Sequence, residues 1–253
     1  MNGKWAGAKT ALITGGARRI GRHIALALGD AGVNIVIHYR HSAAEAESLC
    51  GELLKKGVKA WIVRADFDSS DETPDLIRAA ADSAGKIDFL INNASSFLPS
   101  TVEDLDFSTL TRDLQVNAWS PFMLCRLFAR RFGSGKIINL IDTRVAGYDP
   151  AHFGYFLSKK LLLTMTELLA LELAPRITVN AVAPGLILPP QGKDETYLEK
   201  LATGVPLARH GDTGDIAEAV LFLLRSDFVT GQVIFVDGGS HLKERSNGPY
   251  HHQ

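Results

Sequence analysis

The segment INLIDTRVAGYDPAHFGYFLSKK, residues 138–160, holds three side chains that can take part in proton transfer. Tyr155 and Lys159 are four positions apart, so they lie on one face of a helix. A lysine ammonium beside a phenol stabilises the phenolate and lowers a tyrosine pKa that is normally about 10, which makes the tyrosine a usable acid at neutral pH. Asp142, thirteen positions before Tyr155, can join this transfer. The alternatives for Asp142 are a cap at a strand end or an ion pair with Arg144.

The elements that must position these side chains are short strands alternating with longer helices. Strands are predicted at residues 10–14, 34–39, 60–66, 88–93, 136–141, 177–184 and 232–237. Stretches of helical periodicity include 20–31, 43–56, 72–84, 107–132 and 153–173. Such alternation produces parallel strands joined by right-handed crossovers, with helices on both faces of the sheet. We therefore predict an α/β fold, a Rossmann-like, doubly wound parallel sheet of seven strands, in one domain over residues 1–253.

Residues 186–212 are the least regular part of the chain. They contain paired prolines, several glycines and a short helical pattern near 194–202. In an open α/β fold, an insertion after a late strand can form a lid beside the carboxyl ends of the strands. We predict a substrate lid here.

The composition of the chain excludes several classes of binding partner. With 27 basic and 28 acidic residues, the chain has no global field that favours nucleic acid or an anionic membrane. No apolar run approaches the ~20 residues that span a bilayer, and the N-terminus lacks the apolar core of an export signal. Cys50 and Cys125 stand in unrelated contexts, and the eight histidines, with His251 and His252 in a polar tail expected to be frayed, show no metal-ligand spacing. We expect a soluble, cytoplasmic protein that binds a small molecule and no metal, nucleic acid or membrane.

A glycine-rich turn, LITGGARRIGRHIALAL, joins the first predicted strand to the first helix. Gly15, Gly16 and Gly21 permit close backbone approach, and the helix N-terminus offers free N–H groups to a pyrophosphate. Many strand-to-helix turns need glycine for a positive φ, so this turn alone is weak evidence for a dinucleotide site.

The residues after the second predicted strand favour NADPH. A site for NAD usually has an acidic residue there to bind the ribose 2′-hydroxyl, whereas a 2′-phosphate requires cations. This chain has Arg40, His41 and Ser42, with no carboxylate until Glu45. Arg18 in the glycine turn adds a second cation that can reach the same phosphate. The alternative is that both arginines are solvated surface residues, the default for a lone arginine.

Six motifs appear in an order that resembles the short-chain dehydrogenase/reductase family over almost the whole chain: TGGARRIG, NNAS, VNA, YFLSK, APG and a terminal VDGG. The resemblance implies that Tyr155 is the proton donor, and that Lys159 contacts the nicotinamide ribose while tuning the tyrosine. It implies that Asn117 holds a backbone group or a water in the proton relay. Asp66 is expected at the adenine.

The same resemblance implies a cofactor site along the carboxyl ends of the strands. Asn93 and Ala94 would line its adenosine side, and Pro184 and Gly185 would pass beside the nicotinamide. The residues expected to bind NADPH or NADP are Gly15, Arg18, Arg19, Ile20, Gly21, Tyr39, Arg40, His41, Ser42, Asp66, Phe67, Asn93, Ala94, Ser95, Tyr155, Lys159, Pro184, Gly185, Leu186 and Ile187.

Two residues depart from the usual family pattern, in which a glycine stands at Arg19 and a serine at Asp142. In a carbonyl reductase that serine donates a hydrogen bond to the substrate oxygen, which an ionised carboxylate cannot do. A carboxylate would also repel a developing alkoxide. It suits the reduction of a C=N bond in a heterocycle, because it can accept from ring N–H or amino groups and join a proton relay through the tyrosine.

Both departures occur in the pteridine reductases and bacterial dihydromonapterin reductases, which this chain resembles in HYRHSAAEAESL, NNASSF, IINLID and LELAP. That resemblance implies that Arg19 and Ser95 contact the pterin and the cofactor phosphates. It implies that Phe97 stacks on the pterin opposite the nicotinamide, as suits a flat ring. Alternatively, Phe97 only anchors a loop.

The sequence thus predicts an NADPH-dependent dihydropterin reductase, with Asn117, Asp142, Tyr155 and Lys159 as catalytic residues and Arg19, Ser95, Phe97, Asp142 and Tyr155 at the substrate. One alternative is a reductase of a ketone, such as a 3-oxoacyl or sugar-like substrate. Another is a non-catalytic protein that senses dinucleotides. The apolar surface of the stretches 107–132 and 153–173, together with the family resemblance, predicts a homotetramer.

Overall fold

The computed structural model describes residues 5, 8–69, 72–190 and 192–246. His251 and His252 lie outside the described residues, as does one position of the predicted lid. None of the helices in the described ranges is both long and apolar enough to cross a bilayer.

The strands form one parallel sheet in the order β3-β2-β1-β4-β5-β6-β7. Their bounds are β1 (Thr10–Ile13), β2 (Asn34–Tyr39), β3 (Ala60–Arg64), β4 (Phe89–Asn92), β5 (Gly135–Leu140), β6 (Ile177–Pro184) and β7 (Val233–Val236). Each lies within a residue or two of its predicted position. The Rossmann-like, doubly wound fold is confirmed, and its strand order reverses direction between β1 and β4.

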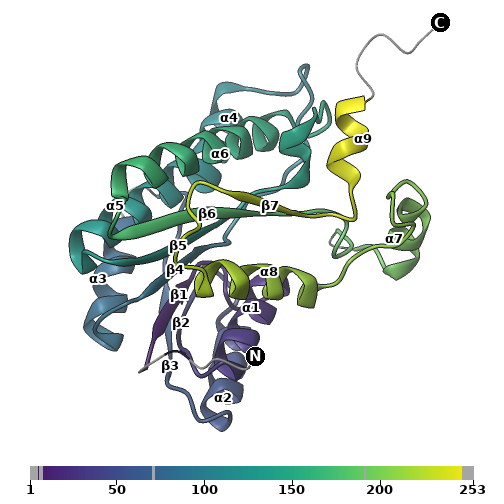
Figure 1. Ribbon diagram of the computed structural model, residues 1–253. Coiled ribbons are helices and arrows are strands. Elements are labelled where there is room, and N and C mark those ends of the chain that lie inside the picture. Colours follow the sequence, from purple (N-terminus) through teal and green to yellow (C-terminus); the bar gives the residue numbers. More distant parts are fainter. Residues whose placement is uncertain (1–4, 6–7, 70–71, 191, 247–253) are drawn as a thin grey trace, which may run out of the picture.

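Helices cover both faces of this sheet (Figure 1). α1 (Arg19–Asp30), α2 (Ala43–Lys55) and α8 (Thr213–Arg225) pack on one face. α3 (Glu72–Ala84), α5 (Ser120–Phe132) and α6 (Phe153–Leu173) pack on the other, with α4 (Phe107–Leu114) leading into α5. α7 (Glu195–Ala202) is set apart from both layers, and α9 (Ser240–Ser246) follows β7 (Figure 1).

The two faces of the sheet build two separate cores because successive side chains of a strand point to opposite sides. Ala11 and Ile13 of β1 pack with the helices of the α1 face. Leu12, between them, packs with the helices of the α6 face. All three are fully buried. Burial on both faces explains why the strands read as nearly continuous apolar runs.

The predicted single helix at 107–132 is wrong in one respect, because a π-helical turn, η1 (Gln115–Trp119), separates α4 from α5. Pro121 stands in the first turn of α5 and has no N–H to donate to the carbonyl four residues back, which interrupts the regular ladder. Such π-turns often occur at functional sites. This one contains Asn117, which is fully buried.

Candidate active site

One cavity of about 700 Å³ lies where the strand order reverses, at the carboxyl ends of the strands. It brings together most of the site residues predicted from the sequence, namely Gly15, Arg18, Arg19, Ile20, Gly21, Tyr39, Arg40, His41, Ser42, Asp66, Phe67, Asn93, Ala94, Ser95, Phe97, Asp142, Tyr155, Gly185 and Leu186. Asn117, Lys159, Pro184 and Ile187 are not in its wall. From the predicted lid, Leu188, Pro190, Tyr197 and Leu201 also line it.

The glycine turn after β1 is held tightly against the end of β4. Gly15 has a φ of +60°, and a Cβ on Gly21 would lie 2.3 Å from the Gly15 carbonyl oxygen. The Thr14 hydroxyl accepts hydrogen bonds from the backbone N–H groups of Asn93 and Ala94 at 2.9 and 3.0 Å. Asn93 Nδ2 donates back to the Thr14 and Gly15 carbonyls at 2.9 and 3.1 Å. The turn therefore requires glycine for both backbone conformation and close approach.

His38, which the sequence analysis did not single out, ties three strand ends together beneath the cavity. Its Nδ1 accepts from the Gly15 N–H at 3.0 Å, and its Nε2 lies 3.0 Å from the Ala65 carbonyl, so the neutral ring carries its proton on Nε2. Burial lowers the pKa of His38 to about 4. The ring also stacks on Phe67 at 4.6 Å. A histidine inside a β-branched strand such as NIVIHY is the one sequence signal for this role.

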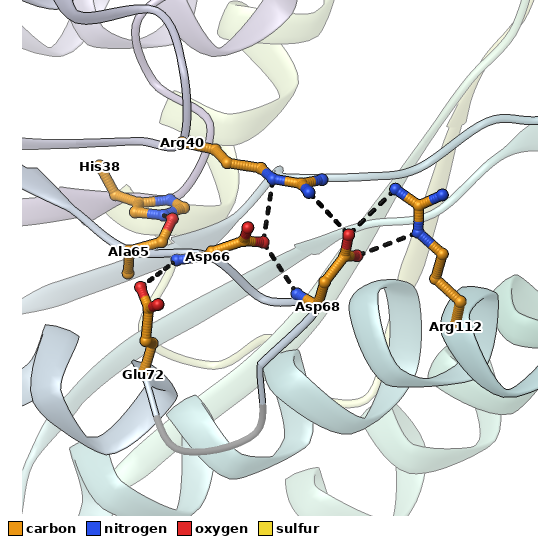
Figure 2. Close-up of polar contacts among 7 residues, drawn as sticks. All are labelled: His38, Arg40, Ala65, Asp66, Asp68, Glu72 and Arg112. Atoms are coloured by element: carbon orange, nitrogen blue, oxygen red, sulfur yellow. Dashed lines mark hydrogen bonds and ion pairs between the residues drawn. The ribbon is translucent and has the colours of Figure 1, made fainter.

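The two cations predicted at a 2′-phosphate are each paired with a carboxylate. Arg18 lies 3.6 Å from Glu45. Arg40, at the start of the loop after β2, contacts Asp66 at 2.9 Å and Asp68 at 2.7 Å (Figure 2). The Arg40 Nε and Asp66 groups are close, but the N–H does not point at the oxygen, so this contact is an ion pair without a hydrogen bond.

At the other end of the cavity, the Tyr155 hydroxyl donates a hydrogen bond to Asp142 Oδ2 at 2.8 Å. The second oxygen, Oδ1, accepts from the Arg144 backbone N–H at 2.8 Å and caps the short 3₁₀ helix η2 (Thr143–Ala146). Asp142 is thus both a cap and the partner of the tyrosine. The alternative of an ion pair with Arg144 is wrong, because that guanidinium pairs with Asp149 at 3.1 Å.

Burial and the Asp142 carboxylate raise the pKa of Tyr155 well above its usual value. This direction is opposite to the lowering predicted from the Tyr155–Lys159 spacing. A negative carboxylate hydrogen-bonded to the phenol disfavours a second negative charge beside it. Burial lowers the pKa of Lys159 to about 8, and its Nζ donates to the Leu140 carbonyl at 2.8 Å while lying 5.7 Å from the centre of the tyrosine ring.

Asn117 joins the loop after β4 to α6. Its Oδ1 accepts from the Ser95 hydroxyl at 3.0 Å and from the Ser96 N–H at 2.8 Å. Its Nδ2 donates to the Ser96 carbonyl and to the Ser158 hydroxyl, both at 3.0 Å. The Ser158 hydroxyl in turn donates to the Tyr155 carbonyl at 2.6 Å. Asn117 therefore holds the Ser96 backbone and fixes Ser95 in the cavity wall.

Phe97 is exposed to 41% and packs at right angles to Tyr155, with ring centres 4.7 Å apart. His152 stacks on it at 4.2 Å, so part of the ring is already covered. The Arg144 guanidinium lies 5.0 Å from the Phe97 centre and lines the cavity. The sequence pattern indicates Arg144 only as a possible partner of Asp142 and does not predict its position in the cavity wall.

Arg19 has a φ of +52°, in the left-handed region that favours glycine. Its Nη2 donates to the Pro189 carbonyl at 2.8 Å, which connects the glycine turn to the segment predicted as a lid. The cost in backbone strain is therefore accompanied by a contact that glycine cannot make.

A glycine turn that faces a buried tyrosine across one cavity, with a buried lysine next to that tyrosine, defines a dinucleotide-dependent oxidoreductase of the short-chain type. The family model described as enoyl-(acyl carrier protein) reductase matches residues 15–241. The chain belongs to the short-chain dehydrogenase/reductase family, a family of oxidoreductases.

Similar curated proteins are named as reductases of acyl carrier protein substrates. The 3-oxoacyl-[acyl-carrier-protein] reductase FabG of Staphylococcus aureus (strain N315) is 35% identical over 248 residues, covering 92% of this chain and 98% of that protein. The 3-oxoacyl-[acyl-carrier-protein] reductase of Synechocystis sp. is 32% identical over 241 residues, covering 92% of this chain and 96% of that protein.

Similar solved structures have a different name. FolM alternative dihydrofolate reductase 1 from Brucella canis, complexed with NADP, is 35% identical, with a TM-score of 0.87 over 92% of this chain and 94% of that one. The FolM protein from Brucella suis, also with NADP, has a TM-score of 0.88 at 35% identity, over 92% of this chain and 95% of that one. The two comparisons therefore agree on the family and differ in the substrate that the names give.

Proposed function

We propose that the protein is an NADPH-dependent reductase of a dihydropterin, such as dihydromonapterin or dihydrobiopterin. The observation that supports this most directly is the 2.8 Å hydrogen bond from the Tyr155 hydroxyl to Asp142. A carboxylate at this position accepts hydrogen bonds from the N–H and amino groups of a pterin, and it repels the alkoxide that forms when a ketone is reduced. The similarity to FolM proteins crystallised with NADP supports the same substrate class and cofactor.

The cavity suits a dinucleotide along its whole length. Gly15 and Gly21 let the turn pack closely against the end of β4, and the N-terminus of α1 that follows would offer its backbone N–H groups to a pyrophosphate. Arg40, His41 and Ser42 would surround the 2′-phosphate, and Leu186 and Gly185 line the opposite end. When bound, NADPH supplies a hydride to the pterin ring.

The protein supplies the proton. The Tyr155 hydroxyl is protonated at neutral pH and can donate its proton to a ring nitrogen, and its raised pKa makes it a weaker acid than the Tyr155–Lys159 spacing predicts. Asp142 orients that hydroxyl and holds the donor groups of the pterin. Lys159 and Asn117 fix the position of the tyrosine and its loop, and Arg19 and Ser95 form the polar edge of the site. The described part of residues 186–212, which places Leu188, Pro190, Tyr197 and Leu201 in the cavity wall, would act as a lid.

The test is the loss of NADPH absorbance with a 7,8-dihydropterin, run beside a panel of ketones. We expect turnover of the pterin, and its collapse in Asp142→Ser. Asp227→Ser is the matched control, because Asp227 is exposed and pairs with Lys136 away from the cavity. Ketone reduction without pterin turnover would overturn the proposal.

The second candidate is reduction of a 3-oxoacyl substrate, which the names of the curated relatives favour. In that case the wild type ignores pterins, and Asp142→Ser retains or gains ketone reduction. Tight NADPH binding without turnover of any substrate would instead support a protein that senses dinucleotides.

We also propose a homotetramer built through α4, α5 and α6. Leu157, Leu161, Leu168 and Leu171 are exposed along one face of α6, and Trp119 is exposed on the neighbouring η1. Such a continuous apolar stripe is typical of a surface that another protein copy covers. Light scattering after gel filtration tests this, and a monomeric mass would contradict it.

A further inference from the structure

Four charged side chains alternate in sign at the adenosine end of the cavity: Asp66, Arg40, Asp68 and Arg112 (Figure 2). Arg40 Nη2 donates to Asp68 Oδ2 at 2.7 Å. Arg112, on α4, donates to both oxygens of Asp68, from Nε at 3.2 Å and from Nη2 at 3.0 Å. Asp68 is therefore shared between two arginines that come from different elements.

The two carboxylates differ in what else they do. Asp66 Oδ1 also accepts from the Asp68 N–H at 3.0 Å and so shapes the loop after β3. The Asp68 oxygens bond only to the two arginines among the described contacts. Burial alone would raise the pKa of Asp68, but the hydrogen bonds and charges of Arg112 and Arg40 outweigh it and lower the pKa. Asp68 is thus an ionised competitor for Arg40.

A 2′-phosphate that binds Arg40 must share its guanidinium with this competitor. Asp68 lines the cavity, so its charge would also lie close to the incoming phosphate. Arg112 does not line the cavity, yet it holds Asp68 in a two-point contact from the far side. That contact shares the carboxylate between two cations and offsets its charge.

We propose that Asp68 and Arg112 set how strongly the protein prefers NADPH to NADH. Asp68 weakens the binding of Arg40 to the 2′-phosphate. Arg112 acts as a positioning residue that holds the Asp68 carboxylate in place. This inference rests on the proposed use of NADPH and names two residues beyond the 2′-phosphate cations. NADH has no 2′-phosphate, so its binding does not depend on this competition.

The experiment measures the dissociation constants of NADPH and NADH by calorimetry for the wild-type protein, three variants of Asp68 and Arg112, and one control variant. Asp68→Asn keeps the shape of the side chain and removes its charge, and we expect NADPH to bind about three- to fivefold more tightly, the scale of one exposed ion pair. Arg112→Gln should weaken NADPH binding by a similar factor. NADH binding should change less than about twofold in both.

The double variant, Asp68→Asn with Arg112→Gln, should resemble Asp68→Asn, because Arg112 acts only through Asp68. Arg130→Gln is the control, an exposed arginine on α5 outside the cavity wall.

Equal changes for NADPH and NADH would mean a merely structural role and would overturn the inference. A wild type that binds NADPH, with variants that keep its preference, would overturn the inference alone. A wild type that binds neither dinucleotide would overturn the proposed function as well.

Discussion

At the Tyr155 end of the cavity the polar side chains are buried and hydrogen-bonded, whereas at the Arg40 end they are ion-paired and partly exposed. Asn117 and Lys159 are at most 3% exposed, and each makes hydrogen bonds only to groups of the protein among the described contacts. The side chains of Arg40 and Arg112 are 37% and 44% exposed. Both ends belong to one cavity.

This difference indicates that the Tyr155 end of the cavity determines the rate of the reaction, whereas the Arg40 end adjusts the affinity for the cofactor. A buried polar group that loses its partner keeps its full desolvation cost, so changes at the Tyr155 end have large effects. Water screens the charges of a partly exposed ion pair, so changes at the Arg40 end shift binding by small factors.

The largest effect is expected for Tyr155→Phe, which removes the proton donor and keeps the ring. Turnover of the preferred substrate should fall by about 10²–10⁴-fold, the usual contribution of a general acid. NADPH binding, measured by calorimetry, should be nearly unchanged. Tyr148→Phe is the control, since Tyr148 is 90% exposed and outside the cavity wall. Unchanged turnover in Tyr155→Phe would assign the proton to another group.

The next largest effect concerns His38, which is buried beneath the Arg40 end of the cavity. The folded pKa of His38 is about 4 against 6.5 in the unfolded chain, so the unfolded state binds the extra proton between these values. Its contribution to stability is complete above pH 6.5 and is lost as the pH falls toward 4. The loss amounts to about 3 kcal/mol.

Urea unfolding measured from pH 7 to pH 4.5 checks this contribution. His38→Gln should be less stable at pH 7 and should lose less stability on acidification than the wild type. Equal slopes in the two proteins would show that His38 is not the group responsible.

Asp113 is an exception at the Tyr155 side, because it is fully buried and neither carboxyl oxygen has a hydrogen-bond partner of ordinary geometry. It lies against Gly154, where a Cβ would be 2.6 Å from Oδ2. Burial raises its pKa, partly offset by Ser96 and Arg112. The folded state thus binds the proton more tightly, and stability falls as the pH rises through the folded pKa.

Asp113→Asn removes the buried charge and keeps the shape of the side chain. We expect the free energy of unfolding to rise by about 1 kcal/mol at pH 7, with a smaller gain at pH 4. Chemical denaturation at both pH values measures it. A loss of stability at pH 7 would mean that the carboxylate has a partner that stabilises its charge.

The smallest effect concerns Arg19, which joins the glycine turn to the Pro189 carbonyl. Arg19→Gly relieves the left-handed backbone and should raise stability by up to about 1 kcal/mol. It also removes the contact with Pro189, so the Michaelis constant for substrate should increase. Thermal unfolding and steady-state kinetics test the two parts separately. Lower stability would show that the Pro189 contact outweighs the strain.

The sequence by itself determined the sheet and the glycine turn, and the resemblance to the family supplied most of the cavity wall. The sheet and the turn depend on local rules: apolar runs of strand length, a positive φ at Gly15, and close approach at Gly21. The order of the motifs indicated that Asp142, thirteen residues before Tyr155, belongs to the same site. The structure brings these two side chains together. Pro121 could have revealed the π-turn, because a proline inside a helical pattern breaks the ladder.

Only the tertiary structure decided the charges and their partners. Arg40 and Asp68 are 28 residues apart, and Asp68 and Arg112 are 44 apart, so no local pattern predicts that they meet. The pKa of Tyr155 rises because burial and the hydrogen-bonded Asp142 carboxylate outweigh the lowering effect of the Arg144 charge. Electrostatic energies depend on distance and solvent exposure, which the fold sets and the order of residues along the chain does not show.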